Sequence, residues 1–119
     1  MSFNLKDSGE RTTTADERKT YPLATGLFDY FPLALREIAH VSYIGNTQHN
    51  LGQPVHWDRS KSSDEADALL RHFSERGSLD TDGVRHTAKM AWRALALLQK
   101  EIEGERLCES FTANTVEPN

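Results

Sequence analysis

The fold of the chain follows from one long periodic stretch, residues 83–103, GVRHTAKMAWRALALLQKEIE. Its apolar residues recur at helical spacing and form one stripe: Ala88, Ala91, Trp92, Leu95, Leu98 and Ile102. The preceding Asp80-Thr81-Asp82 supplies a cap and the negative charge that a helix start favours, and Gly104 is a stop signal. The stretch therefore predicts a long helix that ends near Glu103.

A second helical pattern begins at Pro32, because proline suits the first helical position, and runs to about Ile44. Its apolar stripe is Leu33, Ala34, Ile38, Val41 and Ile44. Glu37 lies in the middle of this stripe. We therefore expect a carboxylate on the core-facing side of the helix.

A third helical pattern begins at Ser62, which has capping-box spacing to Glu65, and runs to about Glu75 before Gly77. Its apolar residues are Ala66, Leu69, Leu70 and Phe73. A shorter helix or turn is expected around Thr25–Tyr30, and no segment alternates as a strand does. The predicted fold class is all-α.

The composition limits the chain to one small domain, because it has 119 residues and a mass of 13.5 kDa. With 14 basic and 18 acidic residues the net charge is −4, which argues against duplex nucleic acid as a partner. No apolar run approaches the roughly 18 residues of a membrane span. The N-terminus lacks the apolar segment of a secretory signal, and the single cysteine, Cys108, forms no internal disulfide. A cytoplasmic protein without a membrane partner is expected.

Large apolar side chains are concentrated in residues 21–103, which we predict to be the domain. Residues 1–20 are expected to form a polar N-terminal arm and residues 104–119 a polar C-terminal tail. Inside the domain, residues 45–61, GNTQHNLGQPVHWDRSK, are expected to form a long connection. Structureless connections longer than about 12–15 residues are usually functional or disordered.

Three carboxylates indicate a metal site. An ionised Glu37 on an apolar stripe needs a partner, because burial of an unpaired charge costs several kcal/mol. Asp64 and Asp67 are i, i+3 neighbours, so their side chains project together. Three carboxylates from two helices suit Mg²⁺ or Mn²⁺. The alternative is that the two aspartates only favour a helix N-terminus while Glu37 pairs with an arginine.

A basic flank follows the longest helix, where Arg85, Lys89 and Arg93 recur at i, i+4, i+8 without an acid between residues 83 and 100. These side chains are spaced to contact a polyphosphate, although most such flanks are simply solvated. His72 and His86 can contact phosphate, ligate a metal or cap a polar cluster. Trp57 either stacks on a base or closes a loop over the core.

Residues 18–103 resemble the phage-type dATP/dGTP pyrophosphohydrolases, small members of the all-α MazG-like nucleotide pyrophosphohydrolase superfamily. The motifs that carry the resemblance are YFP, GNTQHN, HW, DTDGVRHTAK and AWRALALLQ. Motifs of P-loop enzymes, dinucleotide-binding folds, zinc enzymes, HD phosphohydrolases and Nudix hydrolases are absent. The resemblance implies a small helical bundle completed by oligomerisation, as a homodimer or homotetramer.

The superfamily holds its metal with Glu-x-x-Glu on one helix and Glu-x-x-Asp on the next. Asp64-x-x-Asp67 matches the second element, and Glu37 supplies one member of the first. The remaining carboxylate is absent, so either His40 or Asp82 is expected to complete the site.

The resemblance implies hydrolysis of a purine deoxynucleoside triphosphate, dGTP or dATP, at the α–β bond to the monophosphate and pyrophosphate. Glu37 is the expected proton acceptor, and Lys61, Lys89 and Arg93 are expected to stabilise the leaving pyrophosphate. The full set of expected substrate contacts is Asn46, Gln48, His49, Trp57, Lys61, Arg71, Arg85, His86, Lys89 and Arg93. A phage pathway for 2-aminoadenine nucleotides is one setting for such an enzyme, inside the host cell.

A non-enzymatic alternative follows from the missing fourth carboxylate. Position 34 is Ala and position 40 is His where a second Glu is expected. The chain would then be a catalytically inactive nucleotide-binding or helical interaction module on the same scaffold.

Overall fold

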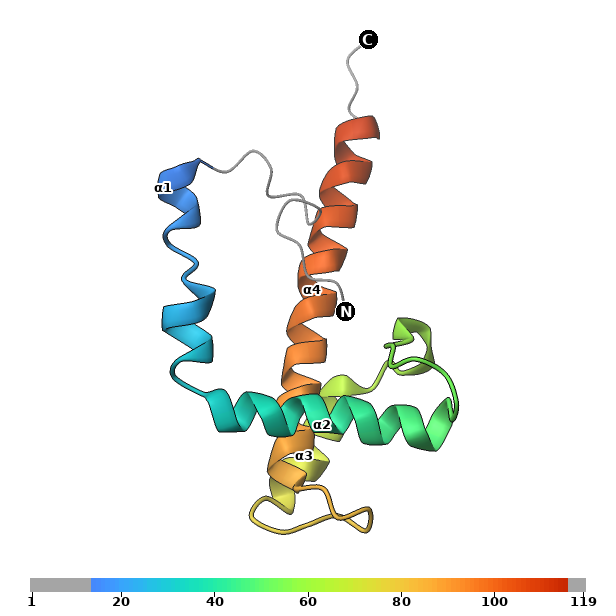
Figure 1. Cartoon of the computed structure of the whole chain (residues 1–119). Helices are drawn as coiled ribbons and strands as arrows, with labels where there is room; N and C mark the ends of the chain where they lie inside the picture. The colour runs from blue at the N-terminus through green and yellow to red at the C-terminus, as the bar shows by residue number, and fades with distance from the viewer. Residues whose placement is uncertain (1–13, 116–119) are drawn as a thin grey trace. The chain divides into compact units, whose positions relative to one another are not determined.

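The computed structural model describes the backbone of residues 14–115 and the side chains as far as Leu107 (Figure 1). The chain divides into two compact units, Met1–Asp58 and Arg59–Asn119. Apart from one isolated β-bridge, all regular structure in the described residues is helical, which confirms the predicted all-α class. None of these helices is long and apolar enough to cross a membrane.

The described part of the first unit, from residue 14 on, contains three helical elements: α1 (Ala15–Arg18), the π-helical turn η2 (Ala24–Phe28) and α2 (Pro32–His49). Thr14 and Glu17 form a capping box around α1, in which each side chain accepts the other residue's backbone N–H at 3.1 Å. The predicted arm 1–20 thus includes a capped helical turn, and its residues 1–13 lie outside the described residues.

Helix α2 begins at Pro32 as predicted but continues to His49, five residues past the expected end at Ile44. A single glycine in a helix costs only about 1 kcal/mol, so Gly45 does not stop it. Within the extra turn, Thr47 Oγ1 donates to the Tyr43 carbonyl at 3.0 Å. The expectation that residues 45–49 belong to the long connection is therefore wrong.

The second unit is built on α3 (Glu65–Ser74) and α4 (His86–Thr115), which pack against each other. Its buried apolar residues are small, and all are at most 6% exposed: Ala68, Val84, Ala88 and Ala96. Small side chains let two helices approach closely. This packing places the polar residues between the helices near one another.

The buried face of α3 differs from the predicted apolar stripe. Glu65 and Ala68 are buried, whereas Leu70 is 61% and Phe73 45% exposed. The helix is rotated toward its polar residues because Glu65 and His72 find partners on α4. The predicted stripe of α4 is likewise half-exposed, since Leu95 and Leu98 are 50% and 52% accessible.

A tight turn connects α3 to α4. The Gly83 N–H donates to the Asp80 carbonyl at 2.9 Å, the Asp80 N–H donates to the Val84 carbonyl at 2.8 Å, and Leu79 bridges Arg85. Gly83 has φ +82°, a conformation that favours glycine. Asp80-Thr81-Asp82 therefore forms this turn rather than the predicted cap, and α4 begins later, at His86.

The end of α4 also differs from the prediction, because the helix passes Gly104 and reaches Thr115. Strong helix formers flank this glycine on both sides, so its small local cost does not end the helix. The limits of the predicted domain, 21–103, and of the tail, 104–119, stay predictions.

Candidate functional site

Two accessible carboxylates lie at the start of α3. Asp64 is the N-cap residue, yet its side chain makes no capping hydrogen bond; it accepts from Ser62 Oγ at 3.0 Å and from Arg71 Nη2 at 3.4 Å. The hydrogen bond from Ser62, followed by that from Arg71, holds the pKa of Asp64 below its usual value. Asp67 is exposed in the first turn, and its side chain makes no hydrogen bond or ion pair with the side chains described, which end at Leu107.

The carboxylate predicted on α2 has a different environment from the one expected. The Glu37 side chain is exposed and makes no hydrogen bond or ion pair among the described side chains, so the expectation of a buried charge that needs a partner is wrong. The apolar stripe around it is only partly covered, since Leu33 is 74% exposed. His40, also exposed, stacks on Tyr43 with ring centroids 6.0 Å apart.

The end of α2 carries three of the predicted base contacts. Asn46 is 8% exposed, and its Nδ2 donates to the Gln53 carbonyl at 2.9 Å. This bond fixes the orientation of the amide, and leaves Asn46 Oδ1 buried without a hydrogen-bond partner among the described residues. Gln48 and His49 are exposed on the same last turns, and Trp57 is half-buried in the connection that follows.

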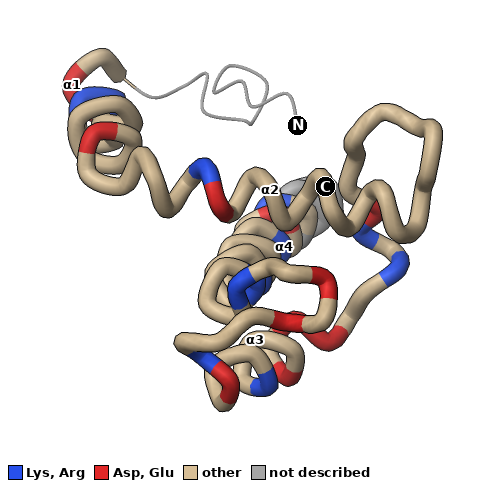
Figure 2. The backbone as a smooth tube through the Cα atoms, turned by 60° about the horizontal axis from the view of Figure 1, so that its bottom comes forward, with Lys and Arg blue, Asp and Glu red and all other residues tan. Residues whose placement is uncertain are grey.

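Two cations of the basic flank, Lys89 and Arg93, are paired with acids from elsewhere in the second unit. Lys89 Nζ donates to Asp80 Oδ2 and to Asp82 Oδ2, both at 2.7 Å. Burial opposes the charge of Lys89, but these two bonds outweigh it and raise the pKa of Lys89. The hydrogen bond from Lys89 in turn lowers the pKa of Asp80 to about 2. Figure 2 shows acidic positions of the α3–α4 connection and basic positions of α4.

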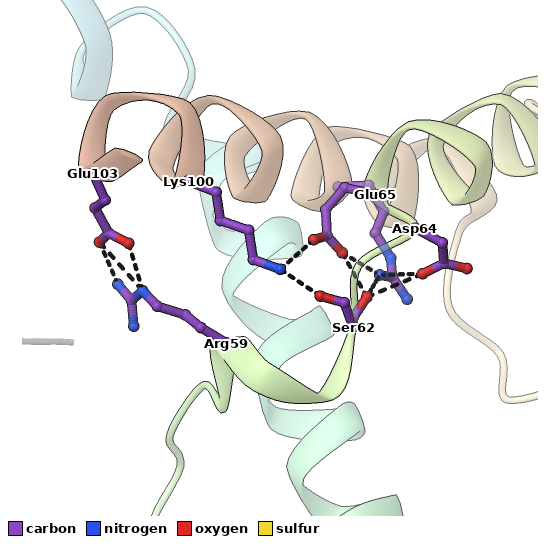
Figure 3. A network of polar contacts seen from close by, with 7 residues as sticks. Arg59, Ser62, Asp64, Glu65, Lys100 and Glu103 are labelled. Carbon is purple, nitrogen blue, oxygen red and sulfur yellow. Dashed lines mark hydrogen bonds and ion pairs between the residues drawn. The ribbon is translucent and has the colours of Figure 1, made fainter. Parts of the chain in front are cut away.

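Arg93 belongs to a second cluster, centred on Glu65. Figure 3 shows Ser62 and Lys100 close to the Glu65 carboxylate. Glu65 is 4% exposed; its Oε1 accepts from Arg93 and its Oε2 from Lys100, at 2.8 and 2.5 Å. Ser62 Oγ donates to Glu65 Oε1 at 2.6 Å, so these two side chains bond to each other and do not form the predicted capping box. Burial by itself raises the pKa of Glu65. The hydrogen bonds from Lys100, Ser62 and Arg93 have the larger effect, so the pKa of Glu65 is below its usual value.

These contacts correct the interpretation of the basic flank. The interval 83–100 contains no acids, but Glu65, Asp80 and Asp82 supply the counter-charges from α3 and the turn. Asp82, an expected metal ligand, is held in an ion pair with Lys89. Among the predicted phosphate contacts, Lys61 and Arg85 are exposed and form no ion pair within residues 14–107.

Another ion pair in this unit, Arg59 with Glu103, predicts a pH dependence of stability. Arg59 donates to both oxygens of Glu103, and this bond, with that from Gln99, lowers the pKa of Glu103 from 4.5. A lowered carboxyl pKa contributes stability above its unfolded value, and the contribution is lost as the pH falls. We expect Arg59→Ala to cost less than about 1 kcal/mol at pH 7.

In chemical denaturation, the Arg59→Ala penalty is expected to disappear as the pH falls below 4.5 and through the lowered pKa of Glu103. Arg36→Ala, at an exposed position of α2, is the control. A penalty that stays constant from pH 7 to pH 3 contradicts this assignment.

A cluster of two histidines and one aspartate lies where α3 and α4 come together. His72 Nδ1 and His86 Nδ1 are 2.9 Å apart. His72, Asp80 and His86 each offer one possible ligand atom, and these three atoms all lie within 4.8 Å of one another. Burial, followed by the charges of His86 and Lys89, lowers the pKa of His72. These three groups can hold a metal ion.

The sequence contains a signal for these contacts that apolar periodicity overlooks. Polar residues of α4 recur at the heptad-like spacing of a packed face: His86, Lys89, Arg93, Lys100 and Glu103. Each of them contacts a residue between positions 59 and 82. Polar residues that recur at heptad-like spacing, in a chain with few large buried apolar residues, therefore indicate a polar helix face that packs against another segment.

Comparison with known proteins identifies a family. The sequence model of the family described as "dATP/dGTP diphosphohydrolase, N-terminal" matches residues 11–109. No curated protein and no solved structure matches the chain.

Proposed function

The chain belongs to the dATP/dGTP diphosphohydrolase family, and from this premise we propose that it hydrolyses dGTP or dATP at the α–β bond to the monophosphate and pyrophosphate. The family is one of nucleoside triphosphate pyrophosphohydrolases, as the resemblance implied. The observation that carries the proposal is the family match across residues 11–109. The setting we propose is the cytoplasm of a phage-infected cell, with modified-purine synthesis as the pathway.

Asp64 and Asp67 support the choice of Mg²⁺ or Mn²⁺, because hard cations prefer carboxylate oxygens. Asp67 has no competing partner in the described residues, and the contact of Asp64 with Arg71 is long and exposed. Glu37 is the third proposed ligand. We propose His40, three positions after Glu37 on the same helix, as the fourth.

These residues would hold the divalent cation, which would supply positive charge against the triphosphate and a water of lowered pKa. In the proposed reaction Glu37 accepts the proton of the attacking water. Lys61 and Arg85, exposed and without ion pairs in the described part of the chain, bind the phosphates and the leaving pyrophosphate. Lys89 and Arg93 act through the carboxylates they hold, as positioning residues.

Asn46 supports recognition of the base. Its Oδ1 is a fixed, buried acceptor without a partner among the described residues, which suits an amino group of adenine or guanine. We expect Asn46→Ala to lower kcat/KM for dATP and dGTP by about tenfold and dTTP hydrolysis by less. The measurement is steady-state kinetics with each nucleotide.

Gln53→Ala is the matched control for Asn46→Ala, because it removes an amide side chain but keeps the backbone carbonyl that Asn46 contacts. Equal losses for all nucleotides in Asn46→Ala would assign the residue to folding alone.

The exposed apolar residues of the second unit support the proposed homo-oligomer. Leu70, Leu95, Leu98 and Ile102 are 39–61% exposed, although they belong to the predicted helical stripes. Light scattering is expected to give a dimer or tetramer, and Leu98→Glu to shift it toward monomer. A strict monomer with full activity contradicts the prediction.

The decisive experiment incubates the chain with each dNTP and Mn²⁺ and separates the products by anion exchange. Monophosphate with pyrophosphate is the expected result, whereas diphosphate with inorganic phosphate refutes the bond assignment. No turnover of any nucleotide, with nucleotide binding retained in metal-free buffer, supports the inactive binding module.

A further inference from the structure

Three donor groups from different segments meet at one end of the α3–α4 pair. His72 lies in the last turn of α3, Asp80 in the connecting turn, and His86 is the first residue of α4. From this geometry we infer a binding site for one borderline transition-metal ion of the zinc class. The site is separate from the carboxylates Asp64 and Asp67, and it does not depend on the proposed hydrolysis.

The distances suit a single ion. Two nitrogens bound to one zinc at about 2.0–2.1 Å lie roughly 3.0–3.4 Å apart, depending on the coordination angle. His72 Nδ1 and His86 Nδ1 are 2.9 Å apart and need to separate by only a few tenths of an ångström. All three donor atoms lie within 4.8 Å of one another, so a small side-chain rotation brings Asp80 into reach.

The donor chemistry selects the metal. Two imidazole nitrogens and one carboxylate oxygen favour Zn²⁺, Co²⁺ or Ni²⁺ over Mg²⁺, which requires oxygen ligands. Three protein ligands leave a fourth position for water or an anion. This preference distinguishes the site from the Mg²⁺ or Mn²⁺ site proposed above.

Neighbouring groups orient the donors. His86 is 5% exposed, and its other ring nitrogen, Nε2, faces Glu75 Oε1 at 3.8 Å. A carboxylate beside the second nitrogen of a metal-binding histidine favours a proton there, which leaves Nδ1 as the ligand atom. Glu75 is 62% exposed and therefore able to move closer.

Asp80 is held in place by two hydrogen bonds and keeps free lone pairs. The Thr81 N–H donates to its Oδ1 and Lys89 to its Oδ2, both at 2.7 Å, whereas a carboxylate accepts about four such bonds. Lys89 also pairs with Asp82, so its positive charge is shared between two carboxylates. The negative charge of Asp80 is thus available to a cation.

The test is a titration of the tag-free full chain with Co²⁺ and then Zn²⁺, after chelator treatment and in millimolar Mg²⁺ to occupy oxygen-rich sites. Cys108 is replaced by Ser throughout, which removes the only thiol. One equivalent of Co²⁺ is expected to give ligand-field absorption that Zn²⁺ abolishes. No binding to the chain with all its histidines overturns the inference.

Variants assign the ligands. His72→Asn, His86→Asn and Asp80→Asn are each expected to weaken Zn²⁺ binding by about 100-fold or more. The matched control, His40→Asn with His49→Asn and His56→Asn, removes the three other histidines, all exposed, and is expected to bind Zn²⁺ normally. Loss of binding in this control, or full binding in His72→Asn and His86→Asn, overturns the site.

A measurement on the control protein covers the possibility that a buried His86 variant fails to fold. Only His72 and His86 remain in that protein, so X-ray absorption of its Zn²⁺ form is expected to show two imidazole ligands. A spectrum with oxygen ligands alone refutes the assignment.

Discussion

Replacing Asp67 by Asn is expected to lower kcat for dGTP or dATP by roughly 100-fold, which corresponds to about 3 kcal/mol of transition-state stabilisation. Asp67 is exposed in the first turn of α3, and its carboxylate makes no hydrogen bond or ion pair within residues 14–107. Its removal therefore breaks no contact in the described structure. The expected loss reflects weaker binding of Mg²⁺ or Mn²⁺, measured by steady-state kinetics across a Mn²⁺ titration.

Asp29→Asn is the control for Asp67→Asn, because Asp29 is an exposed aspartate at the end of η2. The free energy of unfolding of both variants is expected to lie within about 0.5 kcal/mol of that of the parent chain. High Mn²⁺ should partly restore Asp67→Asn if the residue is a ligand. Unchanged kcat and unchanged Mn²⁺ dependence in Asp67→Asn would exclude it from the site.

The helices themselves were predictable, because apolar periodicity and proline placement depend on local sequence. The residues at which the helices end were harder to predict. Gly45 and Gly104 resemble stop signals, yet α2 and α4 continue through them. A glycine costs about 1 kcal/mol in a helix, which the flanking helix formers outweigh.

The orientation of α3 was not predictable from apolar spacing. Hydrophobicity alone directs Leu70 and Phe73 inward, but the structure buries Glu65 because Arg93 and Lys100 neutralise it. Such pairs join residues about 30 positions apart, and a sequence pattern within one helix contains no information on them. For the same reason the basic flank looked unpaired.

Some features of the candidate site were visible in the sequence and others were not. The i, i+3 spacing of Asp64 and Asp67 places both at the start of α3. The approach of His72 to His86 depends on the turn at Asp80–Gly83, which sets where α4 begins. The hydrogen bond from Asn46 to Gln53 likewise depends on the unexpected last turn of α2.

Replacing Glu65 by Ala is expected to have the largest effect on stability, a loss of about 3–5 kcal/mol. Glu65 is 4% exposed and is the shared partner of Arg93 and Lys100, which are themselves only 27% and 26% exposed. Removal of the carboxylate takes away the nearest counter-charge of two poorly solvated cations. A small domain has a free energy of unfolding of about 5–15 kcal/mol, so a large part is lost.

Chemical denaturation at matched protein concentration measures this effect, with Glu101→Ala on the exposed side of α4 as the control. The loss arises from unpaired charge rather than from a missing attraction, because desolvation offsets most of the attraction in a buried ion pair. Joint replacement of Glu65, Arg93 and Lys100 by Met should therefore recover most of the stability that Glu65→Ala loses. If the triple variant is less stable than Glu65→Ala, the network contributes net attraction, and its polar character stabilises the fold directly.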